Sequence, residues 1–394
     1  MLRLTNRVQP YAWGSTTAIP ELLGVAADST PQAELWIGAH PSAPSDAEGT
    51  PLDERIAAAP AQLLGEHRRS DRLGFLLKVL SAAAPLSLQA HPDRATAARR
   101  YAEEEAAGVP LDAPHRLYRD TEHKPELLYA LEPFAALAGF RSPAEARQLL
   151  TGLDLAALPT APADLLGGFL SDLAGEGEGD ALRAATQRIL TAAPEVVAPL
   201  VEAVVTACAG VDDLSARCVV DLAGHYPGDA GVLVSILLNQ VRLEAGEALY
   251  LPAGNVHAYL TGTGIELMAS SDNVLRGGLT PKHVDVPELL RVVDFRVLPP
   301  PLLSARVVSA DEVVFAPGDV DDFALAVLRV HPGAGTTWER AVPRTLLCLQ
   351  GKLEIASASA TLELRRGESA FVGADEHPVR ISGEGRLVAA SPGE

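Results

Sequence analysis

The sequence has few cysteines, few lysines and no long hydrophobic run. Three cysteines in 394 residues cannot all pair, and they are too few for a disulfide framework. No stretch approaches the about 18 uninterrupted apolar residues of a membrane-spanning helix. The opening residues, MLRLTNRVQPYAWGS, also lack the apolar run of a signal peptide. We therefore expect a soluble, cytoplasmic protein without a membrane partner.

Positive charge is scarce as well, because 32 Lys and Arg face 51 Asp and Glu, a net charge of −19. Such an excess repels polyanions over the whole surface, so nucleic acid is not an expected partner. Four of the cations are lysines: Lys78, Lys124, Lys282 and Lys352. A lysine that persists in an arginine-rich chain is a candidate functional group, although a solvated surface amine is the simpler interpretation.

The length predicts two or three domains, and the texture of the chain shows where they lie. Residues 1–141 and 224–298 contain short apolar and β-branched runs cut by Pro and Gly, which predicts strands, with one helix over 93–108. Residues 142–223 have apolar positions three and four apart, which predicts an inserted helical module. A Pro-rich linker then leads into residues 299–394, again a pattern of short strands and glycine turns.

An internal repeat relates the two β-rich parts. GEALYLPAGNVHAYLTG (246–262) aligns without a gap with GESAFVGADEHPVRISG (367–383), although any meander of strands could produce such a match. The first copy resembles the second motif of the cupin jelly-roll barrels, in which the histidine, here His257, is a metal ligand. Pro378 takes its place in the second copy. We therefore expect a mainly β fold with α-helices: two cupin-like jelly-roll barrels, one binding metal at residues 1–141 and 224–298 and one structural, plus the helical insertion.

Four residues on three strand-like segments form a candidate metal site. Gln89 and His91 are two residues apart, so on a strand both side chains point to the same face. Glu126 and His257 would add a carboxylate and a second imidazole, which gives an acceptable zinc set. Simpler interpretations are that His91 caps a turn before proline, that Gln89 is a satisfied core amide, and that His123 competes with Glu126.

Five motifs together resemble the type I mannose-6-phosphate isomerase (phosphomannose isomerase) family. The motifs are QPYAWGS (9–15), AELWIGAHPSAPS (33–45), SLQAHPD (87–93), HKPELLYAL (123–131) and HAYLTGTGIELMASSDNVLRGGLTPKHVDVPELL (257–290). The resemblance implies one zinc ion per chain, held by Gln89, His91, Glu126 and His257. It also implies reversible isomerisation of mannose 6-phosphate and fructose 6-phosphate, which supplies GDP-mannose synthesis or glycolysis. One departure is Asn255-Val256, where longer relatives have Glu-Pro.

An enediol route between the two sugars needs a base and a group that stabilises the developing oxyanion. We predict Glu266 as the base, with Asp272 as a second candidate, and Arg276 as the guanidinium that stabilises the oxyanion. Lys124 completes the catalytic candidates, as a group that contacts phosphate or hydroxyls. The predicted substrate-binding residues are Lys282, which would bind the phosphate, Ser87, and the pocket residues Tyr259, Glu34 and Trp36.

Two other functions fit the same residues. Two histidines and a carboxylate on a cupin barrel can bind Fe(II), so a non-haem iron oxygenase is the main alternative. The other is a non-catalytic sugar-phosphate-binding protein. Arg276 and Lys282 near a metal site favour an anionic phosphosugar over an oxygenase substrate, and no nucleic-acid-binding module accompanies a sensor role. The expected partner is therefore a sugar phosphate, and the expected oligomeric state is a monomer.

Overall fold

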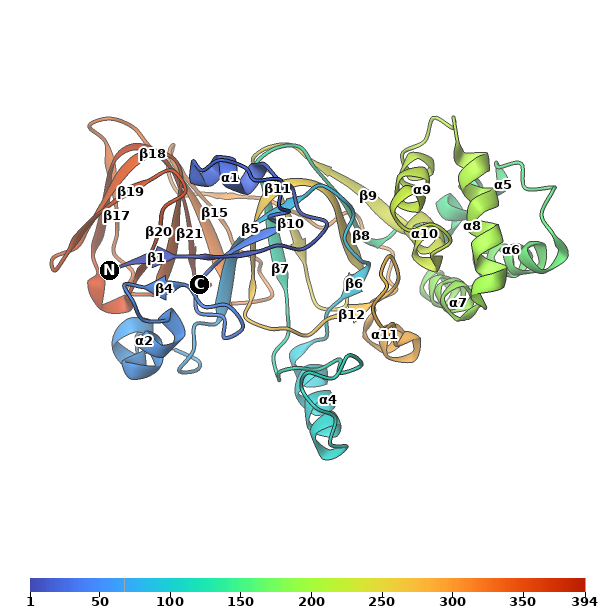
Figure 1. Ribbon diagram of the computed structural model, residues 1–394, viewed down its shortest axis with the longest axis horizontal. Helices are drawn as coiled ribbons and strands as arrows, with labels where there is room; N and C mark the ends of the chain where they lie inside the picture. Colours follow the sequence, from blue (N-terminus) through green and yellow to red (C-terminus); the bar gives the residue numbers. More distant parts are fainter. Residues whose placement is uncertain (67, 394) are drawn as a thin grey trace.

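The computed structural model describes residues 1–66 and 68–393. Two antiparallel sheets and a group of helices follow one another along the long axis of the molecule (Figure 1). The mainly β fold with helices agrees with the prediction. The strand pairings trace open paths through both sheets, so closure into two barrels stays a prediction.

The central sheet has 11 strands and carries the candidate metal site. Its central strand is the 13-residue β11. The first half of β11 pairs with β6 and β8, and the second half pairs with β5 and β7. The strands are β2 (Arg7–Gln9), β3 (Glu34–Ile37), β5 (Phe75–Ala82), β6 (Gln89–Ala90), β7 (Glu126–Ala130), β8 (Phe134–Phe140), β9 (Leu238–Leu243), β10 (Ala248–Leu251), β11 (His257–Ala269), β12 (Leu275–Arg276) and β13 (Leu302–Leu303).

The second sheet has ten strands, mostly from the C-terminal part of the chain. The exceptions are β1 and β4, since β1 pairs with both β20 and β4. Conversely, β13 follows the predicted linker and pairs with β10 of the central sheet, so the sheets exchange strands across the predicted domain limits. The strands are β1 (Leu2–Thr5), β4 (Asp46–Ala47), β14 (Arg306–Val307), β15 (Glu312–Phe315), β16 (Ala324–Val330), β17 (Gly335–Trp338), β18 (Arg344–Ala356), β19 (Thr361–Arg365), β20 (Ser369–Val372) and β21 (Val379–Ser391).

One buried cluster packs the two sheets against each other. It joins Leu77 and Ile265 of the central sheet to Phe371 and Val388 of the second sheet. The two sheets therefore share a core, and the second sheet packs against the central one.

The helical module covers the far end of the central sheet (Figure 1). Its first helix begins as predicted, with Ser142 and Glu145 forming a capping box and Pro143 in the first turn.

Over all the described residues, inside and outside this module, the helices are α1 (Ala18–Leu23), α2 (Leu52–Ala58), α3 (Pro60–Leu64), α4 (Arg94–Ala106), α5 (Pro143–Thr151), α6 (Thr160–Asp172), α7 (Glu178–Thr191), α8 (Pro194–Cys208), α9 (Leu214–His225), α10 (Ala230–Val234) and α11 (Val286–Val292), with 3-10 turns at Ser235–Leu237 and Ala374–Glu376.

The prediction of strands from residue 224 onward is wrong for the start of that range, which includes the run VLVSILL (232–238). Asp229 caps a helix there by accepting a hydrogen bond from the Gly231 amide, and helical structure continues to Leu237. The apolar side chains of this run are buried on all sides, and a short buried run has no period that separates helix from strand.

The repeat corresponds to the same structural unit in each sheet. In each copy a four-residue strand is followed along the chain by a 13-residue strand: β10 and then β11 in the first copy, β20 and then β21 in the second. Glycines at matching positions adopt positive φ, 100° at Gly246 and 80° at Gly367, then 119° at Gly262 and 114° at Gly383. These angles favour glycine, which explains why both copies keep it.

Across the described ranges, no single helix has the length and apolar character needed to cross a membrane; the bent pair α7 and α8, at 113° to each other, passes that test only in combination.

Candidate metal centre and active site

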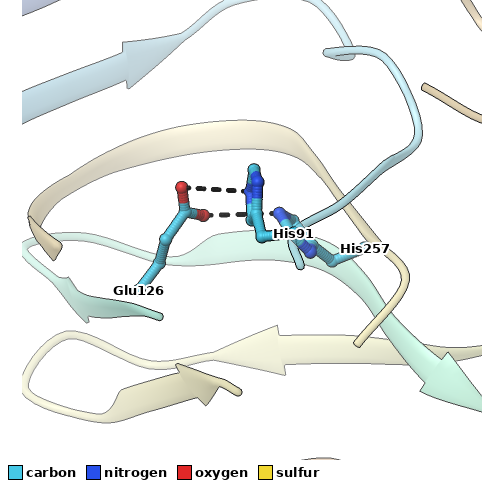
Figure 2. A group of neighbouring side chains, drawn as sticks. All are labelled: His91, Glu126 and His257. Carbon is cyan, nitrogen blue, oxygen red and sulfur yellow. Dashed lines mark ion pairs between the residues drawn. The ribbon is translucent and has the colours of Figure 1, made fainter. Parts of the chain in front are cut away.

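Three of the predicted ligands converge at the ends of strands. Glu126 begins β7, His257 begins β11, and His91 directly follows β6. All three side chains are buried, and their ligand atoms lie within 4.8 Å of one another. The Glu126 carboxylate faces both imidazoles, with Oε1 3.3 Å from His91 Nε2 and Oε2 3.3 Å from His257 Nε2 (Figure 2).

Both imidazoles are oriented by backbone carbonyls on the side away from Glu126. His91 Nδ1 lies 2.7 Å from the Asn273 carbonyl, and His257 Nδ1 lies 3.1 Å from the Asn255 carbonyl. A carbonyl only accepts, so each Nδ1 carries the proton and each Nε2 offers a lone pair. Burial, only partly opposed by Glu126, lowers the pKa of His91 to about 4, so this ring is neutral near pH 7.

The donor set fits a divalent cation. His91 Nε2 is buried and has no hydrogen-bond partner. Two imidazole lone pairs that face a carboxylate repel it unless a positive charge lies between them. Two nitrogens and carboxylate oxygen suit zinc, and they leave positions for a further ligand and for substrate.

Gln89, the fourth predicted ligand, lies beside His257. It is directly opposite His257 in the pairing of β6 with β11. Its amide nitrogen donates to Ser87 Oγ at 3.1 Å, which leaves the amide oxygen available as the fourth ligand. The structure therefore brings together all four residues predicted to bind metal.

A cavity opens beside these residues. Besides the metal-site residues, its wall includes five predicted site residues: Glu34, Ser87, Lys124, Tyr259 and Glu266. Lys124 Nζ lies 3.0 Å from Glu126 Oε1. Burial raises the pKa of Glu126, but the nearby charge of Lys124 opposes it, and this pKa lies well below its usual range. Glu126 is therefore ionised and ready to bind a cation.

Lys78 is a central residue of the cavity that the motifs did not reveal. Its ammonium is buried, 2.8 Å from Glu266 Oε2 and 3.7 Å from Glu34 Oε1. In the sequence it was only one of four lysines, although its place inside the apolar run FLLKVL marks it as unusual. The contacts depend on register, because β5 places Lys78 opposite Glu266 of β11 and opposite Trp36 of β3.

Glu266 faces the cavity, as its alternation with apolar neighbours predicts. Burial raises its pKa, and the nearby carboxylates Glu126 and Glu34 act in the same direction against the charge of Lys78. Burial, followed by the charges of Glu266 and Glu126, raises the pKa of Tyr259 well above its usual value.

Trp36 and Asp272 are predicted site residues that the cavity wall does not include. The indole ring of Trp36 lies 5.0 Å from Lys78 Nζ, and Trp36 Nε1 donates to Glu34 Oε2 at 2.7 Å. Asp272 has a side chain that is 38% exposed and lies 3.6 Å from His40 Nε2. The structure thus brings neither of them to the metal-binding residues.

Arg276 and Lys282 form a basic cluster with Arg119, a residue that the motifs did not reveal. Burial, followed by the charge of Arg119, lowers the pKa of Arg276, and both arginines help burial lower the pKa of Lys282. Within residues 1–66 and 68–393, none of the three has a carboxylate at ion-pair distance. Arg276 is opposite Gln89 in the pairing of β12 with β6, so the cluster borders the metal site.

The backbone at Arg119 is held on both sides. The Tyr118 hydroxyl donates to Glu288 Oε1 at 2.6 Å, and Asp120 Oδ1 accepts from Ser271 Oγ at 2.9 Å. The Arg119 amide itself donates to Asn273 Oδ1 at 2.7 Å. The exposed Arg119 side chain therefore extends from a fixed backbone. Its place just before the HKPELLYAL motif was the only signal in the sequence.

The fold and this site define a metal-binding cupin-type protein whose cavity combines buried carboxylates with cations. Two family models match the chain. The model of phosphomannose isomerase type I, catalytic domain, matches residues 1–143, and the model of mannose-6-phosphate isomerase, cupin domain, matches residues 313–392. The chain is 39% identical to mannose-6-phosphate isomerase of Salmonella typhimurium and 38% identical to that of Escherichia coli, each over 98% of both chains. The chain belongs to the type I phosphomannose isomerase family.

Solved structures give the same result for the fold. A mannose 6-phosphate isomerase bound with zinc and yttrium is 38% identical with a TM-score of 0.89, over the full length of both chains. A zinc-bound mannose 6-phosphate isomerase is 37% identical with a TM-score of 0.90, over 100% of this chain and 99% of the other. These relatives lend no support to the oxygenase or to the non-catalytic binding protein.

Proposed function

We propose that the chain is a zinc-dependent aldose–ketose isomerase that interconverts mannose 6-phosphate and fructose 6-phosphate through an enediol. The observation that carries the proposal is the buried group of His91, Glu126 and His257, with Lys124 beside it and a basic cluster at its border. Gln89 would complete the zinc site. Zinc bound there would supply a Lewis acid that polarises the sugar carbonyl.

In this proposal the residues of the chain divide the remaining work. Glu266 takes the proton from one carbon of the C1–C2 pair and returns it to the other. Lys78 holds the Glu266 carboxylate at 2.8 Å and so fixes its direction. The guanidinium of Arg276 stabilises the negative charge on the enediolate oxygens. Lys124, Ser87 and Tyr259 contact sugar hydroxyls from the cavity wall.

Lys282 and Arg119 of the basic cluster would bind the phosphate, while Arg276 would act on the enediolate oxygens. Three unpaired cations on a protein of net charge −19 repel one another, and a dianion offsets that repulsion. The acidic surface elsewhere repels polyanions, so the cluster selects a small phosphate ester rather than a nucleic acid.

We also propose that the protein supplies mannose 6-phosphate for GDP-mannose synthesis, acts in the cytoplasm and is a monomer. All three cysteines are buried and unpaired, which suits a reducing compartment. Light scattering coupled to size exclusion would measure the mass of the protein in solution, and a dimer mass would contradict the monomer.

A coupled assay tests the proposed activity. Metal-replete protein is mixed with mannose 6-phosphate, and the fructose 6-phosphate formed is converted by glucose-6-phosphate isomerase and dehydrogenase to give NADPH. We expect sustained turnover, together with the reverse reaction from fructose 6-phosphate. An absence of turnover by protein that holds one zinc per chain would contradict the proposal.

Arg276→Ala is expected to lower kcat by about 10² to 10³ and to leave bound zinc unchanged, because it removes charge stabilisation but no metal ligand. Zinc content and coupled-assay kinetics measure the two effects. Arg99→Ala is the matched control, since Arg99 is exposed on α4 and pairs with Glu103. A kcat equal to that of the wild type would remove Arg276 from the mechanism.

Arg119→Gln is expected to raise KM about tenfold and to change kcat little, because a lost charge-assisted contact to phosphate weakens ground and transition states alike. Inhibition by inorganic phosphate should weaken by a similar factor. Arg99→Gln again serves as control. Unchanged phosphate inhibition in Arg119→Gln would show that this arginine does not contact the anion.

A further inference from the structure

Asp322 lies beside the second sheet, but its side chain contacts residues from the part of the chain that carries the metal site. It lies in the connection between β15 and β16, and its side chain is only 8% exposed. Its Oδ2 lies 2.9 Å from His123 Nε2, and its Oδ1 lies 2.8 Å from an Arg94 guanidinium nitrogen. Arg69 approaches the same carboxylate at 3.8 Å. All three partners come from the N-terminal half of the chain.

This carboxylate is ionised despite its burial. Burial raises the pKa of Asp322, but the hydrogen bond and charge of His123, with Arg94 and Arg69, more than reverse the effect and lower it. A buried carboxylate is retained only where its partners are fixed, because an unpaired one is costly. The contact therefore fixes His123 as well as Asp322.

His123 is the residue before Lys124, and the two side chains have different partners. His123 contacts Asp322, whereas Lys124 contacts Glu126 Oε1 at 3.0 Å inside the cavity. Both residues precede the first residue of β7, so the ladder of the sheet does not hold them.

A second set of contacts holds the same segment from the opposite direction. Asn273 Nδ2 donates to the Glu122 carbonyl at 2.8 Å, and Ser271 Oγ lies 3.3 Å from that carbonyl. Asn273 also orients His91 through its own carbonyl. The segment that carries Lys124 is thus held by Asn273, in the connection between β11 and β12, and by Asp322, in the connection between β15 and β16.

We propose that Asp322 is a positioning residue that acts through His123 to hold Lys124 against Glu126. The second sheet, which has no counterpart of His257, thereby contributes to the active site of the first. The kinetic consequence rests on the proposed isomerase function, whereas the fixing of residues 120–125 does not.

Asp322→Asn keeps the shape of the side chain and removes its charge. We expect kcat to fall about tenfold with KM changed less than about twofold, because the misplaced group acts on turnover more than on binding. Amide hydrogen exchange across residues 120–125 should become about tenfold faster at unchanged zinc content. Asp321→Asn is the matched control, since Asp321 is the preceding residue, is 49% exposed and pairs with Arg69 at the surface. It should match the wild type in both measurements.

A double-mutant cycle tests the route through His123. If Asp322 acts through His123, His123→Gln should reproduce the loss of kcat, and the double variant should be no worse than either single variant. Additive losses would overturn the proposal, as would a normal kcat in Asp322→Asn when measured below its unfolding temperature. If the wild-type protein has no isomerase activity, the proposed function fails, and hydrogen exchange alone decides the positioning role: unchanged exchange in Asp322→Asn would overturn it.

Discussion

His257→Ala is expected to lose zinc and, with it, isomerase activity. The substitution removes one of two imidazoles whose Nε2 atoms face Glu126, and the buried site offers no replacement donor at that position. Loss of a group that merely orients a ligand costs about 10 to 100-fold in metal affinity, so loss of a ligand itself should cost more. Metal content after dialysis and competition with a chromophoric chelator measure the loss.

His331→Ala is the matched control, because His331 is exposed on the second sheet and pairs there with Asp311. It should keep one zinc per chain and full activity. Chelation of the wild type should abolish turnover, and Zn²⁺ but not Fe²⁺ should restore it. A His257→Ala protein that retains stoichiometric zinc would contradict the predicted ligand set.

Lys78→Met is expected to have the largest effect on stability. The substitution keeps a long flexible side chain and removes the one ammonium that lies between the buried carboxylates of Glu266 and Glu34. Removing one partner of a buried ion pair costs about 3–5 kcal/mol, because the remaining charge has no partner. Urea unfolding of metal-free protein should therefore show a much lower midpoint than for the wild type.

Two further variants separate the charge effect from packing. Lys352→Met should change stability by less than about 0.5 kcal/mol, because Lys352 is 61% exposed and pairs with Glu363 at the surface. Adding Glu266→Gln to Lys78→Met should recover part of the lost stability while activity stays low. An unfolding midpoint for Lys78→Met equal to that of the wild type would show that the buried carboxylates do not depend on this lysine.

The residues of the candidate metal site could be chosen from the sequence because each is a possible ligand type at the edge of a strand motif. Gln89, His91, Glu126 and His257 needed only local spacing and family motifs to be chosen. Lys78 needed more, since its meeting with Glu266 depends on the register of β5 against β11, which no local pattern fixes. Arg119 and Asp322 were out of reach for the same reason, because their partners lie far away in the chain.

The same limit applies to the fold. The capping box at Ser142 is a local signal, and the structure contains the predicted helix. The run VLVSILL has no such signal, and its burial inside the helical module decided its conformation. The pairing of β1 with β20 could not be predicted, since it joins residues at opposite ends of the chain.

That pairing has a consequence for how the protein is made. Leu2 of β1 leaves the ribosome 369 positions before its partner Phe371 is synthesised. At about 5–20 residues per second, the N-terminal strand waits for tens of seconds before its partner exists. During that time its unpaired edge is open to chaperones and to other nascent chains. The second sheet, and the core it shares with the catalytic one, can therefore form only after residue 371 has been synthesised.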